Sequence, residues 1–484
     1  MAFFYCKNCL CYARYMSKTF FFYDLETSGL SAREDRIMQF AGIRTDMDFN
    51  QIGEPVNELV QLNNDTLPSP EALMVTGITP QKTVEEGWTE AQFAKKLAEE
   101  WFTPDTIIVG FNNVRFDDEF IRHLFWRNFY DPYEWAWKDG RSRWDLLDVV
   151  RMTRALRPEG INWPVDENGA ETNHLELITK ANGISHEKAH DALCDVLASI
   201  DVARLIKQNQ PQLFDYLLNM RDKKQVQKLV NLDDKKPFVY TSGRYDKKFQ
   251  KTTVAIALSA SSHGNVLVYD LRHNPRDFVK LSEDELRKKV FATWEERKAE
   301  GFAPVPVKQL QYNRCPAVAP LGVLEQGDAW NKIGLTKEIV ESNLKILLEN
   351  PEFAEKIRSV YESRPEPIKS VEVEAQLYDG FLSDTDRIRV ESVRNASERQ
   401  LADFHPEFSD DRLSDLLMHY KARSFPKSLT DTELTAWEAW RQERLQRQLP
   451  GVIESISKLS KTELNESQQF VLAELQFWIE NVAA

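Results

Sequence analysis

The stretch that decides the fold is FFFYDLETSGL, residues 20–30. Its aromatic half has strong strand propensity, and Ser28-Gly29 is a turn signal. Residues two apart on a strand point to the same face, so Asp24 and Glu26 are predicted to project into one place. Two carboxylates so close together repel each other unless a divalent cation neutralises them. The stretch predicts a cation site at a strand end, although the pair alone fits two solvated acids equally well.

Composition limits the classes of protein to consider. A chain of 484 residues suggests two to four domains, and 42% hydrophobic and 11% aromatic residues predict well-packed globular ones. The formal net charge of −14 excludes a protein that coats nucleic acid by bulk charge, so any polyanion site must be a local basic groove. No run approaches the roughly 18 apolar residues of a membrane span, and the few cysteines suit a reducing cytoplasm.

The first residues invite two readings that the sequence does not support. Three cysteines lie between residues 6 and 11, but a structural zinc needs four ligands and no second pair or histidine lies nearby. Basic residues interrupt the apolar letters, which is not typical of a signal peptide. We expect residues 1–18 to be a disordered extension, and Met16 stays open as an alternative start of translation.

From residue 19 to 210 short apolar strands alternate with helical stretches, which predicts an α/β domain. The predicted strands are residues 20–24, 37–45, 58–62 and 106–110, and the predicted helices are residues 89–101, 117–127, 144–156, 175–182 and 189–207.

The sequence changes character after a charged connection near residue 221. Residues 211–361 are predicted to form a small mixed domain with a β core, and residues 362–484 a helical C-terminal domain. The last third is helical from about residue 337, with Pro365 and Pro367 as a probable hinge. The predicted elements of the middle part are strands at 238–240, 252–258 and 265–270 and one helix at 284–298.

Further acids follow the first pair. Asp117 lies where the predicted strand at 106–110 passes into a helix, and His190 and Asp195 lie on one predicted helix. Positions five apart on a helix differ by about 140°, so both side chains could reach one cleft. Taken singly, Asp117 also fits a charge at a helix N-terminus and His190 a surface histidine. Taken together, in this order, four acids and a histidine predict one site.

The order D-x-E-T, N-x-x-F-D, H-x-x-x-x-D resembles the DEDD superfamily of 3′→5′ exonucleases, in its histidine-bearing DEDDh branch. The blocks are residues 24–27, 113–117 and 190–195. Other segments are similar to the bacterial exonuclease I family, and the similarity covers nearly the whole chain after residue 18. These segments are residues 112–120, 127–133, 143–149, 155–164, 313–316 and 420–426.

The resemblance implies a fold and an activity. The fold is a ribonuclease-H-like α/β exonuclease domain at 19–210, an SH3-like β-rich domain at 211–361 and a helical extension. Together these three parts are expected to form a clamp around single-stranded DNA. The activity is hydrolysis from the 3′ end to nucleoside 5′-monophosphates in DNA repair and recombination. The resemblance also implies a partner, the acidic C-terminal tail of single-stranded DNA-binding protein, for which Arg157, Lys236 and Arg314 are candidate contacts. We expect a monomer.

The acids suit this reaction. Oxygen-only ligands favour Mg²⁺, with Mn²⁺ as a substitute, over zinc. Two such ions, about 3.5–4 Å apart, generate a hydroxide and stabilise the leaving oxygen. Asp24 is predicted to bridge both ions, and His190 has the intrinsic pKa of a general base for the attacking water. The predicted metal ligands are Asp24, Glu26, Asp117 and Asp195.

Aromatic and basic residues alternate between residues 122 and 151. Aromatic faces stack on unpaired bases at about 1–3 kcal/mol each, and arginine holds the backbone. Trp144 and Phe129 are predicted to be core residues instead. His174 stands where relatives carry arginine, which leaves its role open. The candidate substrate contacts implied by the resemblance are Glu26, Thr27, Arg122, Tyr133, Trp137, Arg151 and His174.

Two rival functions share parts of this pattern. A DEDDh ribonuclease or oligoribonuclease carries the same blocks, but such chains are usually much shorter. Comparing the turnover of matched DNA and RNA oligomers distinguishes this activity from that of a DNA exonuclease. A catalytically inactive single-strand binding scaffold is the second rival. It is disfavoured because all five catalytic positions are filled.

Overall fold

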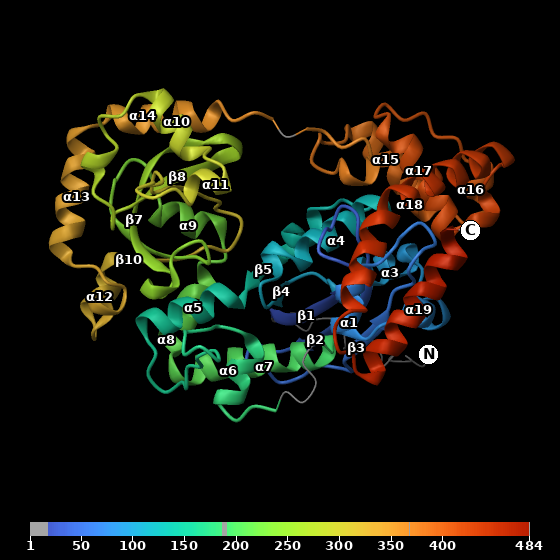
Figure 1. Cartoon of the computed structure of the whole chain (residues 1–484), viewed down its shortest axis with the longest axis horizontal. Helices are drawn as coiled ribbons and strands as arrows, with labels where there is room; N and C mark the ends of the chain where they lie inside the picture. Colours follow the sequence, from blue (N-terminus) through green and yellow to red (C-terminus); the bar gives the residue numbers. More distant parts are fainter. Residues whose placement is uncertain (1–17, 186–190, 367, 484) are drawn as a thin grey trace, which may run out of the picture.

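The computed structural model describes residues 18–185, 191–366 and 368–483. Figure 1 shows three lobes: an α/β lobe, a β-rich lobe beside α5 and α8, and a helical lobe on the opposite side. An extended segment after α14 (Glu352–Glu362) crosses from the β-rich lobe to the helical lobe. Among the described residues, no helix has the length and apolar character to cross a membrane.

The α/β lobe is built on a mixed five-stranded sheet of order β3-β2-β1-β4-β5. The central strand β1 pairs antiparallel with β2 and parallel with β4, and β4 pairs parallel with β5. The strands are β1 (Thr19–Thr27), β2 (Ile37–Thr45), β3 (Val56–Leu59), β4 (Thr106–Gly110) and β5 (Ser142–Asp145).

Alternation along β1 divides its aromatic residues between two cores. Phe20 and Phe22 pack on one face with Trp144 and residues of α7 (Ala192–Asn209), whereas Phe21 and Tyr23 pack on the other face. Because the period of a strand is two, Asp24 shares the face of Phe20 and Phe22. The first core therefore places α7 against the face that carries the acids.

Helices surround this sheet on both sides. Serine or threonine caps the first three at their N-termini, as the preference for such caps leads one to expect. They are α1 (Pro70–Thr76), α2 (Pro80–Glu86), α3 (Glu90–Lys96), α4 (Asp117–Arg127), α5 (Leu146–Leu156), α6 (Leu175–Ala181), α7 and α8 (Pro211–Asn219).

The β-rich lobe contains an antiparallel sheet of order β10-β6-β7-β8-β9. Helices α13 and α14 belong to this lobe, because residues such as Phe353 of α14 pack against Tyr269 of the sheet. Its strands are β6 (Phe238–Thr241), β7 (Thr252–Ser261), β8 (Asn265–Asp270), β9 (Val307–Leu310) and β10 (Ala317–Pro320). Its helices are α9 (Lys223–Leu229), α10 (Glu283–Val290), α11 (Trp294–Arg297), α12 (Ala329–Lys332), α13 (Lys337–Glu349) and α14.

The helical lobe packs on the α/β lobe through two apolar clusters, one around Trp126 and Leu416 and one around Leu73 and Leu475. Its helices are α15 (Asp384–Asn395), α16 (Glu398–Ala402), α17 (Arg412–Ser424), α18 (Asp431–Leu459) and α19 (Glu466–Ala483).

A buried ion network reinforces the same interface. Arg36 of the α/β lobe bonds Glu374 of the helical lobe at 2.7 Å, and Arg423 bonds Asp65 at 2.8 Å in the opposite direction across the interface. His419 Nδ1 lies 2.9 Å from a carboxylate oxygen of Glu374. We call Arg36, Asp65, Glu374, His419 and Arg423 the interface network.

Several predicted boundaries are wrong. The predicted helix at 144–156 begins at Leu146, because Trp144 lies on β5, a strand too short to show a period. Helix α7 begins at Ala192 rather than 189, with Asp191 as its cap. The strand predicted at 58–62 is β3, which ends at Leu59.

The β-rich lobe contains further differences. The helix predicted at 284–298 is two helices, since Thr293 caps a new one. Strands β9 and β10 were not predicted, because neighbouring prolines suggested loops.

Candidate active site

Strand β1 delivers the first two carboxylates to one point. Asp24 pairs with Ala41 and Glu26 with Gln39 of β2, so both remain in the regular antiparallel ladder. The register shifts between Glu26 and Thr27, and the strand ends there. The Thr27 hydroxyl then donates to the Gly29 carbonyl at 2.7 Å, which stabilises the turn. The predicted shared face of the D-x-E pair is therefore present in the structure.

Helix α7 brings a third carboxylate to this pair. Asp191 caps the helix by accepting from the Cys194 amide, and Asp195 lies in the first turn. One carboxylate oxygen from each of Asp24, Glu26 and Asp195 lies within 4.8 Å of the other two. Three oxygen donors at this spacing fit a hard divalent cation, which binds carboxylates in preference to softer ligands.

Asp117 lies near this group, because its charge raises the pKa of Asp24 and Glu26, but it is not one of the three carboxylates within 4.8 Å of one another. It is the first residue of α4 and follows a tight turn in which Asn112 has a φ of 72°. Asp145, at the end of β5, accepts hydrogen bonds from the amides of Asn112 at 3.0 Å and Val114 at 3.3 Å. The turn that presents Asp117 is thus held by a carboxylate from the neighbouring strand.

Burial and mutual repulsion of these acids favour the binding of a cation. Burial raises the pKa of Glu26 to about 8, and the negative charges of Asp195 and Asp117 add to the effect. Burial likewise raises the pKa of Asp117 to about 8, with Asp118 as the next cause. The pKa of Asp24 is also raised well above its usual value, by burial and then by Asp117 and Asp195. A bound divalent cation would relieve this repulsion.

A second group of buried polar side chains ties the two halves of the site together. The Tyr23 hydroxyl donates to the Asp118 carboxylate at 2.6 Å, so the neighbours of Asp24 and Asp117 are directly linked. Arg143 forms a short ion pair with the other oxygen of Asp118 and donates to the Asn313 carbonyl of the β-rich lobe at 2.9 Å. The bond from Tyr23 fixes β1 to α4 beside the acids.

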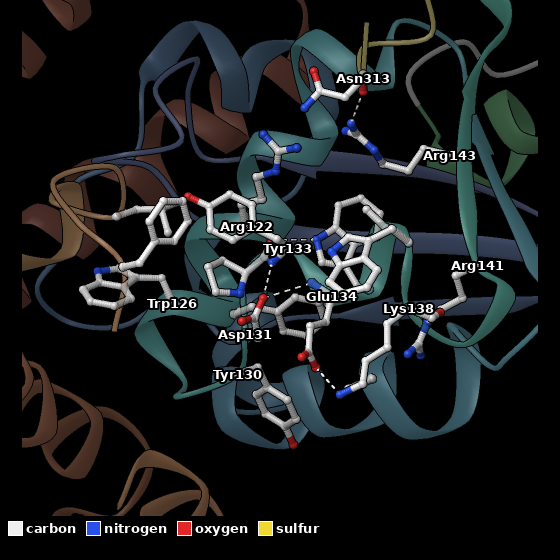
Figure 2. Close-up of a pocket in the computed structure, with 18 of the residues that line it drawn as sticks. Arg122, Trp126, Tyr130, Asp131, Tyr133, Glu134, Lys138, Arg141, Arg143 and Asn313 are labelled. Atoms are coloured by element: carbon white, nitrogen blue, oxygen red, sulfur yellow. Dashed lines mark hydrogen bonds and ion pairs between the residues drawn. The ribbon is translucent and has the colours of Figure 1, made fainter. Parts of the chain in front are cut away.

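A pocket of about 1280 Å³ lies where all three lobes meet, and Figure 2 shows its lining. Ten lysine or arginine side chains and four aspartate or glutamate side chains line it, a local basic surface in a chain of net charge −14. The Arg122 guanidinium lies 5.6 Å from the centre of the Tyr133 ring. Trp137 is 63% exposed at the same pocket and offers an open aromatic face.

Three of the predicted contacts with the DNA lie together in the structure, and two lie elsewhere. Arg122, Tyr133 and Trp137 line the pocket. Arg151 instead binds Asp148 at 2.6 Å beside Gly243 of the β-rich lobe. His174 is exposed and precedes α6 without capping it through its side chain. The predicted general base His190 lies outside the described residues.

Sequence reasoning missed the residues that support the site. Asp118, Arg143 and Asp145 lie in the segments that carry the family resemblance, but no motif gave them a task. Burial was the missing signal, because the side chains of Asp118, Arg143 and Asp145 are less than a tenth exposed. A buried charge requires a partner, and only the structure shows which partner it has.

The sheet, with acids from β1, α4 and α7, defines the class of a cation-dependent exonuclease. A family model described as "Exonuclease" matches residues 21–203. Models described as "Exonuclease I SH3-like domain" and "Exonuclease I C-terminal domain" match residues 221–363 and 371–482. The chain belongs to the exonuclease I family. The predicted fold, an exonuclease domain with SH3-like and helical extensions, is confirmed.

Individual relatives support the same assignment. Exodeoxyribonuclease I of Haemophilus influenzae is 40% identical over 456 residues, which cover 94% of this chain and 96% of the relative. The crystal structure of E. coli exonuclease I in complex with a dA16 oligonucleotide has a TM-score of 0.93 at 38% identity, covering 96% of this chain and all of that one. A zinc-bound form of the E. coli enzyme with single-stranded DNA has a TM-score of 0.92 at 38% identity, covering 97% and 100%.

Proposed function

We propose that this chain is an exodeoxyribonuclease that removes nucleotides one at a time from the 3′ end of single-stranded DNA. The products are nucleoside 5′-monophosphates. One observation carries the proposal: carboxylate oxygens of Asp24, Glu26 and Asp195 lie within 4.8 Å of one another in a chain of this family, and burial and mutual repulsion raise the pKa of Asp24 and Glu26. The relatives solved with oligonucleotides support DNA as the substrate.

We assign Asp24, Glu26, Asp117 and Asp195 as ligands of two Mg²⁺ ions, with Mn²⁺ as a substitute and Asp24 as the ligand shared by both. The donor set is oxygen only, which Mg²⁺ prefers and which supports this choice. When bound, such ions lower the pKa of a water and stabilise negative charge on the phosphate and the leaving oxygen. A zinc-bound relative agrees with a divalent site but does not select the metal.

The chain's own residues have separate tasks in this proposal. His190 takes the proton of the attacking water, because imidazole titrates near neutral pH. Thr27 and the turn after it, at the end of β1, receive the terminal nucleotide. Arg122, Tyr133 and Trp137 hold the strand further from its end, by charge and by stacking on bases. Stacking is tolerant of sequence, so digestion is expected to be independent of base composition.

The cellular role follows from the substrate. An enzyme that degrades single-stranded DNA from a 3′ end serves DNA repair and recombination, and bacterial DNA lies in the cytoplasm. We further propose that the chain works as a monomer. We also propose that it binds the C-terminal tail of single-stranded DNA-binding protein through Arg157, Lys236 and Arg314. Arg157 donates to the Val323 carbonyl and to Gln326 of the β-rich lobe, and Arg314 donates to Glu119 of α4.

A digestion assay tests the proposal. The 5′-labelled oligomers are single-stranded DNA with a free 3′ hydroxyl, the same DNA with a blocked 3′ end, and RNA of the same sequence. We expect cation-dependent release of mononucleotides from the DNA with a free 3′ hydroxyl, so that the labelled strand becomes progressively shorter. Asp24→Asn is expected to abolish release, whereas Asp215→Asn, at an exposed acid of α8, is the control. Equal digestion of the blocked DNA, or faster digestion of the RNA, would refute the assignment.

A further inference from the structure

Three lobes of the molecule meet at one carboxylate, that of Glu119 in α4. Its Oε1 accepts from Arg122 of the same helix and from Arg314 of the β-rich lobe, both at 3.1 Å. Its Oε2 accepts a short hydrogen bond from the hydroxyl of Tyr378 in the helical lobe. Arg314 follows Glu119 by 195 residues and Tyr378 follows it by 259. This junction joins parts of the chain that no local pattern connects.

The junction also sets the positions of the pocket residues. The Tyr378 hydroxyl accepts from Arg122 at 3.2 Å while it donates to Glu119, so the three groups close a small ring of bonds. Arg122 in turn lies over Tyr133, and the Tyr133 ring is 6.4 Å from that of Tyr378 and 6.1 Å from that of Phe381. Glu119 therefore holds Arg122 beside three aromatic rings, of which Tyr133 and Phe381 line the pocket (Figure 2 shows Arg122 above Tyr133).

The charges at this junction do not cancel, because the Glu119 carboxylate accepts from both Arg122 and Arg314. One negative charge cannot neutralise two guanidinium groups. Among the described residues, the buried Nε of Arg122 also has no hydrogen-bond partner. Glu119 thus orients both arginines and leaves excess positive charge beside the pocket that Arg122 lines.

We infer that Glu119 is a positioning residue that joins the three lobes at the strand-binding pocket and determines how tightly long DNA strands are held. This inference rests on the proposed function. The hydrogen bonds of the Glu119 carboxylate go to Arg122, Arg314 and Tyr378 rather than to the proposed metal ligands. Its loss is expected to weaken the binding of strands long enough to enter the pocket and to leave hydrolysis at the 3′ end unaffected.

The test compares a thymidine trimer with a long thymidine oligomer in the full-length protein. For Glu119→Gln we expect KM for the long oligomer to rise about tenfold, with kcat for both oligomers and KM for the trimer within about twofold. Anisotropy of a labelled long oligomer in EDTA should show the same tenfold loss of affinity without catalysis. Glu362→Gln, which removes a glutamate paired with Arg358 in α14, is the control and should change none of these values.

A double-mutant cycle identifies the contact. If Glu119 acts through Arg314, then Glu119→Gln and Arg314→Gln together should weaken binding no more than about twofold beyond either change alone. Thermal unfolding of each variant shows whether the lobes remain folded. An equal fall of kcat on trimer and long oligomer would overturn the inference, because Glu119 would then act on Asp117. Additive effects would overturn it as well. A wild-type protein that digests neither oligomer would contradict the proposed function instead.

Discussion

Two groups of carboxylates among the described residues differ in the charges that lie next to them. In the interface network, Asp65 and Glu374 are buried among Arg36, Arg423 and His419. Burial raises the pKa of Glu374, but Arg423 and Arg36 outweigh it and hold the pKa well below its usual value. At the end of β1, burial and mutual repulsion raise the pKa of Asp24 and Glu26.

The difference separates a structural role from a functional one. Carboxylates that the chain neutralises itself contribute to the assembly of the lobes. The β1 acids raise each other's pKa by mutual repulsion, and the binding of a cation would relieve this repulsion. The comparison supports the proposal that the β1 acids bind a cation, whereas the interface network joins the α/β and helical lobes.

The largest effect is expected from removing the shared ligand. Asp24→Asn should lower the rate of mononucleotide release more than about 100-fold. Loss of a residue that only hydrogen-bonds to a metal ligand already lowers metal affinity or activity about 10–100-fold. The unfolding temperature of the metal-free protein should stay the same or rise, because one repelling charge is gone. Nucleotide release and thermal unfolding measure the two effects. A variant that loses stability along with activity would place Asp24 in the structural group.

The converse is expected for the interface network. Glu374→Gln leaves Arg36 and Arg423 without part of their compensation, and breaking a buried ion pair costs about 3–5 kcal/mol. The midpoint of unfolding should fall, while kcat on a thymidine trimer should change little. Denaturant unfolding measures the midpoint, and nucleotide release from the trimer by the folded variant measures kcat. Unchanged stability would show that the network does not hold the lobes together.

A smaller effect is expected from the link beside the acids. Tyr23→Phe removes only the hydroxyl that bonds Asp118. Cation affinity should fall about tenfold, as is typical when a residue that supports a metal site is replaced. A higher Mg²⁺ concentration should restore the rate of nucleotide release. Calorimetric titration with Mn²⁺ measures the affinity directly. Tyr312→Phe, which removes a hydroxyl bonded to the Val230 carbonyl in the β-rich lobe, is the matched control.

The two groups should also respond to pH in opposite directions. Glu26 and Asp117 have pKa values of about 8 in the metal-free fold and near 4 when unfolded. The folded state therefore holds more protons between these values, and its stability should decline as pH rises from about 4 to about 8. Glu374 has a lowered pKa, so its contribution is present above its unfolded pKa of about 4.3 and is lost as pH falls below it.

Thermal unfolding across pH, with EDTA and with saturating Mg²⁺, separates these contributions. Mg²⁺ binds the deprotonated acids, so its stabilising effect should grow toward pH 8 and remain constant above it. The loss at acid pH should be the same with and without the cation. A stabilising effect of Mg²⁺ that does not depend on pH would contradict the raised pKa values.

The sequence predicted the parts of the site that depend on local periods. The shared face of Asp24 and Glu26 follows from the period of a strand, and Asp117 at a helix start follows from the strand-to-helix transition. Strand β5 could not be predicted, because Trp144 and Asp145 also suit the start of the helix that follows. Glu119 shows a different limit: its partners Arg314 and Tyr378 lie in other lobes, and no spacing within α4 indicates them.

Calorimetric titration of Mn²⁺ into the metal-free protein tests the central claim most directly. The wild-type protein and Glu374→Gln should both release or absorb heat on binding, because the interface network already contains its cations. Asp24→Asn should show no binding in the same concentration range. Unchanged binding by Asp24→Asn, or its loss in a folded Glu374→Gln, would contradict the assignment of the β1 acids as the cation site.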